Sequence, residues 1–162
     1  MKNKIKKYLK EIIFFAFTLF ILTNIISLYK SKDLNKSILG ITSVELLDNS
    51  IFKVDKSKPI LIHFWATWCP TCKVEASNIE RISQNFQVLS IAVDSKNVQD
   101  YLNANGLTFK TVHDRDGQIA KYFNISVFPT TIIYDNNQEM VVSEVGYTST
   151  CGLWLRMLWA NY

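Results

Sequence analysis

The stretch ILIHFWATWCPTC, from Ile60 to Cys72, decides the fold. Its first six residues are almost entirely apolar on both alternating faces, which is typical of a central strand in a covered sheet. Pro70 then begins a run with the periodicity of an amphipathic helix. Cys69 and Cys72 therefore stand on the first turn of a helix, on one face, close enough for a disulfide to open and close there.

The position of Cys69 favours a reactive thiol. Unpaired backbone N–H groups and the helix dipole stabilise negative charge at a helix start, so a thiolate forms more readily there. Pro70 suits the first helical position, where its missing N–H costs nothing. A structural disulfide and half of a zinc site are the alternatives, but zinc needs two more nearby ligands. Only Cys151, His63 and His113 remain, and they are scattered, so the sequence favours redox chemistry and no metal.

Charge divides the chain into two parts. Residues 1–32 carry seven Lys and one Glu, a net charge of +6, whereas residues 33–162 carry eleven Lys or Arg and thirteen Asp or Glu, a net charge of −2. The net charge of +4 on the whole 162-residue chain therefore belongs to its amino end. The length suits one soluble domain with an appendage. A domain without a basic stripe argues against nucleic acid as a partner.

The amino end has the pattern of a membrane signal. Five lysines within residues 1–11 precede residues 12–29, which carry no charge. A helix of that length spans about 27 Å, enough for the hydrocarbon core of a bilayer. The positive-inside rule then makes 1–11 a cytoplasmic basic tail and 12–29 a single-pass signal anchor in the inner (cytoplasmic) membrane. The rest of the chain is expected on the periplasmic side.

A cleaved signal peptide is the alternative for this segment. A polar break at Thr23-Asn24 fits it, but no small-x-small cleavage site follows, so the uncleaved transmembrane helix is preferred. Residues 30–43 are then a polar linker, and residues 44–162 form the folded domain. Export places the domain in an oxidising compartment, where paired cysteines form disulfides.

Strand-like and helix-like segments alternate along the folded domain. We expect strands at 59–65, 87–93, 108–112, 130–134 and 140–145, two short strands within 44–54, and helices at 70–85, 95–105, 118–123 and 148–160. Alternating strand–helix units followed by a hairpin and a last helix predict an α/β fold. Its mixed central sheet is expected to be covered by helices on both faces.

With these elements in order, the chain resembles the thioredoxin superfamily, and most of all its membrane-tethered TlpA/ResA branch. The resemblance implies a thioredoxin-like fold over about residues 40–160, preceded by one transmembrane helix. The ending VGYTS at 145–149, with Gly152-Leu153, further resembles disulfide oxidoreductases of the suppressor-of-copper-sensitivity D type. The features that carry the match are FWATWCPTC at 64–72, Glu75, the extra segment 94–116, VFPTT at 127–131 and Gly146.

The family implies roles for the residues around the pair. Cys69 is the attacking thiol and Cys72 the buried resolving thiol, and the two form the redox-active disulfide. Pro129 is the cis-proline that faces them. A proline directly before a strand is unusual enough to agree with this, and an ordinary trans proline at a strand start is the alternative. The backbone of Phe128, a bulkier residue than is usual there, then pairs with an incoming substrate strand.

Glu75 and His63 are the titratable candidates beside the pair. In the TlpA/ResA branch the glutamate three residues after the second cysteine handles protons. A solvated carboxylate that merely suits a helix start is the alternative for Glu75. His63 stands where ordinary thioredoxins have a buried aspartate. It either accepts a proton near neutral pH or is a neutral, hydrogen-bonded core residue.

Aromatic residues and a third cysteine complete the candidates. Trp68 is expected to shield the disulfide and to form a substrate-docking surface with Pro70 and Thr71, whereas Trp65 is expected in the core. Cys151, at the start of the last helix, is an odd cysteine, which in an exported protein suggests a partner or a resolving thiol. A small buried hydrophobic residue is the preferred interpretation of Cys151.

These residues predict thiol–disulfide exchange with exported proteins, with apocytochrome c as one candidate, and with a membrane thiol that donates or accepts electrons. No prosthetic group is needed as a cofactor, because the disulfide itself carries two electrons. Pro and Thr between the cysteines carry no charge that sets the direction, so an oxidant or isomerase is an alternative to a reductant. A copper- or other metal-binding module is the alternative from another class. A peroxide-reducing role is weaker still, because its cysteine does not usually stand at a WCxxC helix start.

Overall fold

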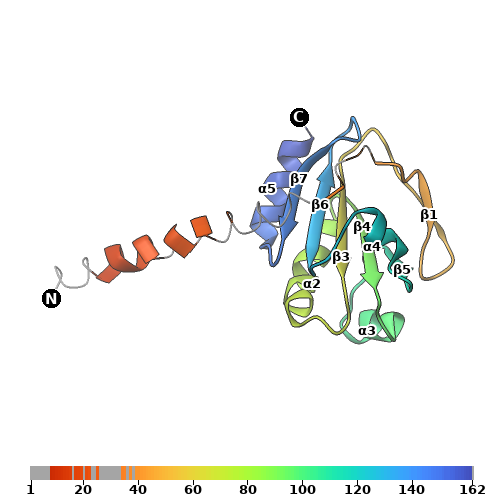
Figure 1. Ribbon diagram of the computed structural model, residues 1–162, viewed down its shortest axis with the longest axis horizontal. Coiled ribbons are helices and arrows are strands. Elements are labelled where there is room, and N and C mark those ends of the chain that lie inside the picture. The colour runs from red at the N-terminus through yellow and green to blue at the C-terminus, as the bar shows by residue number, and fades with distance from the viewer. Residues whose placement is uncertain are drawn as a thin grey trace.

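The computed structural model describes residues 8–15, 17–19, 21, 22, 25, 34, 35, 37 and 39–161. Its centre is a five-stranded sheet in the order β5-β4-β3-β6-β7, beside which β1 and β2 form an antiparallel hairpin (Figure 1). The strands are β1 (Ser43–Glu45), β2 (Ile51–Lys53), β3 (Ile60–Trp65), β4 (Gln87–Val93), β5 (Thr111–Asp114), β6 (Thr130–Tyr134) and β7 (Met140–Val145). The described helices of the domain are α2 (Pro70–Ser83), α3 (Val98–Ala104), α4 (Gln118–Tyr122) and α5 (Thr150–Ala160).

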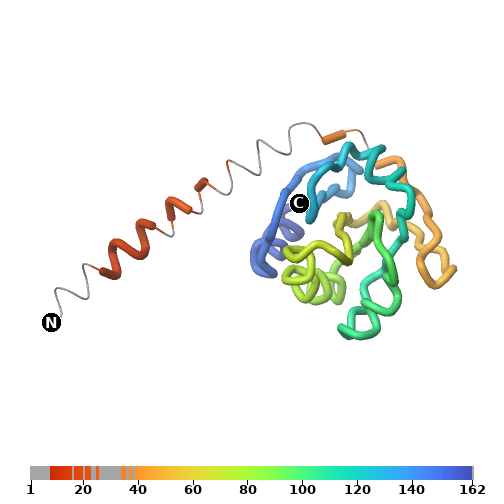
Figure 2. The backbone as a smooth tube through the Cα atoms, turned by 60° about the horizontal axis from the view of Figure 1, so that its bottom comes forward, coloured from red at the N-terminus to blue at the C-terminus, as the bar shows by residue number. Residues whose placement is uncertain are grey.

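The central strand β3 is buried along its whole length. It runs parallel to β4 and antiparallel to β6, which confirms the predicted mixed sheet. Its side chains alternate between two apolar clusters, because successive residues of a strand point to opposite faces. Leu61 and Trp65 pack with α2, α3 and α5, whereas Ile60, Ile62 and Phe64 pack with α4 and the β1–β2 hairpin. Figure 2 shows α2 and α5 on one side of the domain and the hairpin well away from them.

The topology brings two distant segments to one end of the sheet. The carboxyl end of β3 leads through residues 66–69 into the amino end of α2. Because β6 is antiparallel to β3, with Phe64 opposite Thr130, the residues just before β6 lie at this same end. The cysteine pair and Pro129 are therefore neighbours in space, and the β6–β7 turn lies at the opposite end.

Helical residues are also described at the amino end of the chain, and their large apolar side chains are exposed. Within the part of the chain that the structure describes, no helix is long and apolar enough to cross a membrane. The described residues cover the predicted anchor and basic tail only in part. Positions 1–7, 16, 20, 23, 24 and 26–29 lie outside them.

Part of the predicted linker packs on the domain. Leu34 and Leu39 are buried in the cluster on the α4 face. The backbone N–H of Asn35 donates to the carbonyl of Phe123, and that of Leu39 to the carbonyl of Gln138, each at 3.1 Å. The domain therefore holds the chain at these points, ahead of the boundary predicted at residue 44.

One predicted strand is shifted. The segment expected at 108–112 enters the sheet only at Thr111. Glu80 on α2 explains the shift, because its Oε2 accepts the backbone N–H groups of Thr108 and Phe109 at 2.7 and 3.2 Å. Two N–H groups held by a carboxylate cannot donate to a neighbouring strand. The other predicted elements begin and end within three residues of the observed ones.

Candidate active site

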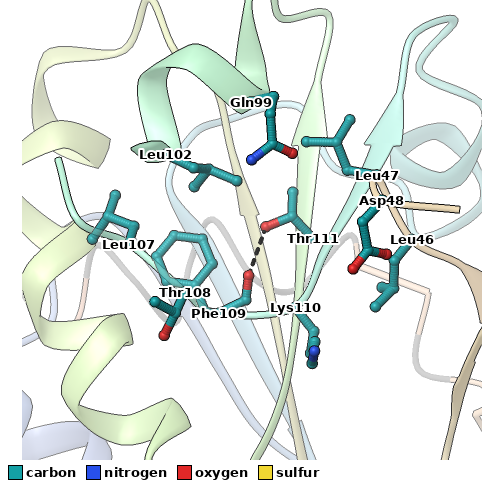
Figure 3. Close-up of a pocket in the computed structure, with 10 residues that line it drawn as sticks. All are labelled: Leu46, Leu47, Asp48, Gln99, Leu102, Leu107, Thr108, Phe109, Lys110 and Thr111. Atoms are coloured by element: carbon teal, nitrogen blue, oxygen red, sulfur yellow. Dashed lines mark hydrogen bonds between the residues drawn. The ribbon is translucent and has the colours of Figure 1, made fainter. Parts of the chain in front are cut away.

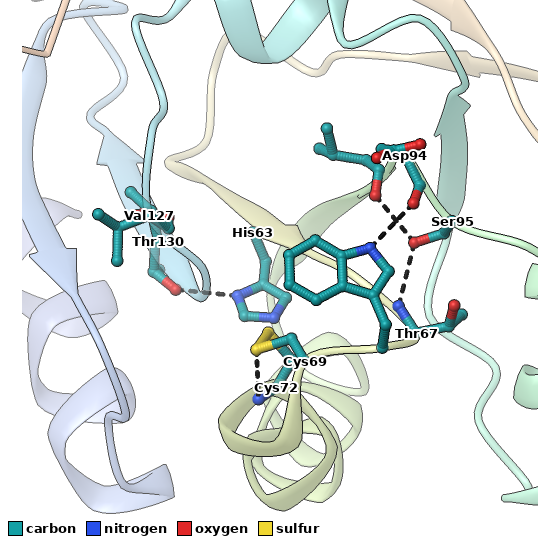
Figure 4. Close-up of a disulfide and its surroundings, with 11 residues drawn as sticks. His63, Thr67, Cys69, Cys72, Asp94, Ser95, Val127 and Thr130 are labelled. Atoms are coloured by element: carbon teal, nitrogen blue, oxygen red, sulfur yellow. Dashed lines mark hydrogen bonds between the residues drawn. A yellow bond between two sulfur atoms is a disulfide. The ribbon is translucent and has the colours of Figure 1, made fainter.

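A disulfide joins Cys69 to Cys72 at the amino end of α2 (Figure 4). Cys69 is the residue that caps the helix, and Pro70 is its first residue, as predicted. The backbone N–H of Cys72 donates to Sγ of Cys69 at 3.2 Å. Such a donor, together with the helix dipole, stabilises a thiolate on Cys69 once the bond is reduced. Cys69 is 5% exposed and Cys72 is 1% exposed, so Cys69 is slightly the more accessible of the two residues.

An aromatic pair connects the cysteine loop to the segment before β6. The peptide bond between Phe128 and Pro129 is cis, as the resemblance implies. The rings of Trp68 and Phe128 meet edge to face, with centroids 5.9 Å apart. Trp68 is 58% exposed, so this pair presents apolar surface to an approaching partner. Trp65, in contrast, is buried in the core, which confirms its predicted place.

The loop before the cysteines is braced by the loop after β4. The backbone N–H of Thr67 donates to Oγ of Ser95 at 3.0 Å, and the indole N–H of Trp68 donates to the carbonyl of Asp94 at 2.9 Å. The hydroxyl of Ser95 donates in turn to the carbonyl of Val93 at 2.9 Å (Figure 4). Sequence reasoning missed these contacts. The order of the strands could have indicated these contacts, because β3 and β4 are adjacent parallel strands whose carboxyl ends meet at one edge of the sheet.

Glu75 is fully buried on α2, one turn beyond Cys72. Its Oε1 accepts the backbone N–H of Thr148 at 2.8 Å. Its Oε2 is buried with no hydrogen-bond partner among the described residues. The pKa of Glu75 is raised from 4.5 to about 7, mainly by burial; the Thr148 N–H opposes this rise and the negative charge of Glu144 adds to it. The alternative of a solvated carboxylate is therefore wrong.

His63 lies on the face of β3 that carries the disulfide (Figure 4). Its side chain is 2% exposed, and its Nδ1 is 3.0 Å from the hydroxyl of Thr131 on β6. Burial lowers the pKa of His63 to about 3, so the ring is neutral near pH 7. This geometry fits the alternative of a neutral, hydrogen-bonded core residue. A catalytic role for His63 stays a prediction.

Cys151 is a free cysteine and takes no part in the disulfide. It is exposed, so the expectation of a buried hydrophobic residue is wrong. The reason is its helical position, since Cys151, Leu155 and Trp159 are spaced four apart on the outer face of α5. Among the described residues, no group of three or more His, Cys, Asp or Glu side chains is arranged to hold a metal ion.

A separate pocket lies between the β1–β2 hairpin, α3 and β5, away from the cysteine pair (Figure 3). Leu47, Leu102 and Phe109 give it apolar walls, and Asp48 and Lys110 stand at its rim. None of the residues that line it belongs to the disulfide site.

Comparison with known proteins places the chain in a family. Residues 39–143 match the AhpC/TSA family. A thioredoxin-like protein of Haemophilus influenzae is 33% identical over 165 aligned residues, which cover 98% of each chain. The sporulation thiol-disulfide oxidoreductase A of Bacillus subtilis is 28% identical over 57% of this chain and 62% of its own length. A thioredoxin-family thiol:disulfide interchange protein from Chlorobium tepidum has a crystal structure that superposes on this one with a TM-score of 0.69. The match covers 79% of this chain and 98% of that chain at 23% sequence identity, and it shows that the two share a fold. The chain thus belongs to the AhpC/TSA family, has the thioredoxin-like fold and is related to enzymes named thiol-disulfide oxidoreductases.

Proposed function

We propose that this protein is a membrane-tethered enzyme that exchanges disulfides with other exported proteins through Cys69 and Cys72. One observation carries the proposal: the disulfide stands at the amino end of α2, beside the exposed Trp68 and the half-buried Phe128, with the buried Glu75 one turn further along the helix. The relatives named thiol-disulfide oxidoreductases support the enzyme class.

The exchange follows from the positions of the two sulfurs. The thiolate of reduced Cys69 attacks a substrate disulfide, a new bond forms between Cys69 and the substrate, and the other substrate sulfur leaves as a thiolate. The thiolate of Cys72 then attacks Sγ of Cys69, closes the enzyme disulfide and releases the second substrate thiolate. Two electrons move from the enzyme to the substrate, and the reverse sequence oxidises a substrate dithiol.

Glu75 is the proton carrier of this proposal. A thiolate must form on Cys72 before it can resolve the mixed disulfide, and that thiolate must be protonated again when the enzyme is reduced. A buried carboxyl one turn away, with a pKa of about 7, gives up and regains a proton at working pH. Its unpartnered Oε2 is the atom with a free lone pair or proton for this task.

Substrate contact is assigned to the surface around the pair. Pro70 and Thr71 are exposed between the cysteines, and Trp68 and Phe128 flank them with apolar rings. The backbone of Phe128 offers hydrogen bonds to an extended segment of the partner. An unfolded chain with exposed cysteines, such as apocytochrome c, suits such a surface.

Partner capture in cells tests the proposal. Cys72→Ala keeps the attacking sulfur and cannot resolve the mixed disulfide, so exported proteins should accumulate bound to Cys69. The matched control is the double variant Cys69→Ala/Cys72→Ala, which should capture none. Equal recovery from both variants would overturn the proposal. The equilibrium of the wild-type disulfide with glutathione then assigns the protein as reductant or oxidant.

The tether rests on the sequence of residues 1–29, with its basic tail and uncharged stretch. An uncleaved anchor predicts that the protein sediments with the cytoplasmic membrane and keeps its amino-terminal residues. Detergent should release it, and high salt should not. A soluble form beginning near residue 30 would show a cleaved signal peptide instead.

A further inference from the structure

An ion pair lies on the face of the sheet that carries Glu75. Nε and Nη2 of Arg156 on α5 both donate to Oε1 of Glu144 on β7, with Nε at 2.9 Å. Nη1 of Arg156 also donates to the carbonyl of Gly152 at 3.0 Å, which fixes the guanidinium on its own helix. The Glu144 side chain is 17% exposed and that of Arg156 is 28% exposed, so the pair is only partly screened by water.

Glu144 belongs to a row of polar side chains that crosses the sheet beneath α2. It stands opposite Thr131 on β6, and Thr131 stands opposite His63 on β3. Four residues beyond Glu144, the chain reaches Thr148, whose N–H donates to Glu75. A short stretch of backbone therefore links the ion pair to the buried carboxyl.

A second side chain of α2 fixes this stretch. Nδ2 of Asn78 donates to the carbonyl of Thr148 at 3.0 Å, and the hydroxyl of Thr150 donates to Oδ1 of Asn78 at 2.8 Å. Glu75 and Asn78 thus hold both polar groups of the Thr148 backbone. These contacts fix the backbone that leads from the end of β7 to α5 against α2.

Among the described residues, the titratable and charged groups around Glu75 that matter for its proton come from four elements. Cys72 lies on its own helix, His63 on β3 is neutral near pH 7, Glu144 lies on β7 and Arg156 on α5. A fixed anion near a second carboxyl favours the protonated form of that carboxyl.

We propose that Glu144 and Arg156 are positioning residues for the disulfide exchange: the negative charge of Glu144 favours a proton on Glu75 for delivery to Cys72, while Arg156 fixes the Glu144 side chain and offsets part of its charge. The proposal rests on the proposed function. When the thiolate of a reducing partner attacks Sγ of Cys69, the bond between Cys69 and Cys72 breaks. Cys72 leaves as a thiolate and takes the proton of Glu75, which becomes a carboxylate.

The experiment follows the carboxyl carbon of Glu75 by NMR as pH is raised in the oxidised full-length protein. Glu144→Gln removes the anion, so the midpoint of Glu75 should fall by about one pH unit, a tenfold loss of proton affinity. Arg156→Gln should shift the midpoint to higher pH, and Arg156→Lys should restore it toward wild type. Glu139→Gln removes an exposed carboxylate from the β6–β7 turn, at the opposite end of the sheet, and is the matched control.

A Glu75 midpoint that is the same in Glu144→Gln, Glu139→Gln and wild type would overturn the proposal. If Glu144→Gln does not fold, Arg156→Gln tests the same coupling with the opposite sign. The pH profile of exchange should shift with the NMR midpoint in each variant. The titration needs no turnover, so a wild-type protein inactive in exchange would overturn the proposed function and leave the coupling between Glu75 and Glu144 measurable.

Discussion

The two faces of the central sheet differ in what their strands bury. Toward α4, the side chains of β3 are Ile60, Ile62 and Phe64, and they meet other apolar groups. Toward α2, the same sheet places His63 and Thr131 in its interior, and both are almost fully buried. Burying a polar group is costly unless it is hydrogen-bonded, and these two bond to each other. Along β3, the polar side chain is therefore buried on the face next to the disulfide, and the face toward α4 is apolar.

The largest effect should come from a substitution on the face that carries the disulfide. Cys69→Ser removes the attacking sulfur, so the reduction of a disulfide-linked protein such as insulin should fall to the rate of the buffer thiol alone. The free energy of unfolding of the reduced protein should change little, because the hydroxyl can still cap α2. A variant that keeps a tenth or more of wild-type turnover would show that another sulfur carries the reaction.

A substitution on the face toward α4 should lower the stability and leave the exchange rate unchanged. Phe64 is fully buried, so Phe64→Ala should lower the free energy of unfolding by about 3–5 kcal/mol. Exchange per folded molecule should stay at the wild-type rate, because Phe64 points away from the cysteines. Urea unfolding gives the stability, and turnover is then measured at equal folded fraction. A loss of turnover under those conditions would break the separation between the two faces.

Glu75 and His63, both buried on the face next to the disulfide, should change the free energy of unfolding with pH in opposite directions. Folding raises the pKa of Glu75 from 4.5 to about 7, so the folded state binds the proton more tightly and stability falls as pH rises through that window. Folding lowers the pKa of His63 from 6.5 to about 3, so the unfolded state binds the proton more tightly and stability rises between those values. Each titration should change the free energy of unfolding by about 3–5 kcal/mol between the unfolded and folded pKa values of the group.

Two variants separate these slopes. Glu75→Gln should abolish the fall in the free energy of unfolding above pH 4.5 and keep its rise between about pH 3 and pH 6.5. His63→Leu should abolish that rise and keep the fall. Urea unfolding between pH 3 and pH 8 measures both. If the two variants keep the slope of wild type, the burial of these groups does not govern their titration.

The smallest effect should come from outside both faces. Cys151 is exposed on the outer side of α5, so Cys151→Ser should change the free energy of unfolding by less than about 0.5 kcal/mol. Exchange with a protein disulfide should be unchanged. A clear loss of turnover would make Cys151 a third participant in the reaction.

Local sequence patterns were sufficient for most of the fold. The apolar stretch of β3 and the cysteine pair at the start of α2 both follow from residue type and spacing. The shift of β5 could not be predicted, because it depends on Glu80, which reaches across from α2 to Thr108. A contact between residues 28 positions apart leaves no periodic signal in either segment.

The candidate site was predictable at its centre and not at its edge. The cysteines and Pro129 have specific sequence patterns, whereas Glu144 and Arg156 look like ordinary surface charges until the sheet register and α5 bring them together. The burial of Cys151 was mispredicted because α5 is apolar on both its inner and outer faces. Leu153 and Met157 are buried, whereas Leu155 and Trp159 are exposed, and residue type does not tell the two faces apart.

Competitive alkylation of the reduced protein shows whether Cys69 or Cys72 is the attacking thiol. The Cys151→Ser background removes the exposed third thiol, and mass mapping identifies which sulfur reacts first between pH 6 and pH 7. Cys69 should be modified first, with a pKa below the free value of about 8.5, because the helix start and the N–H of Cys72 stabilise its thiolate. Faster modification of Cys72 would contradict this prediction.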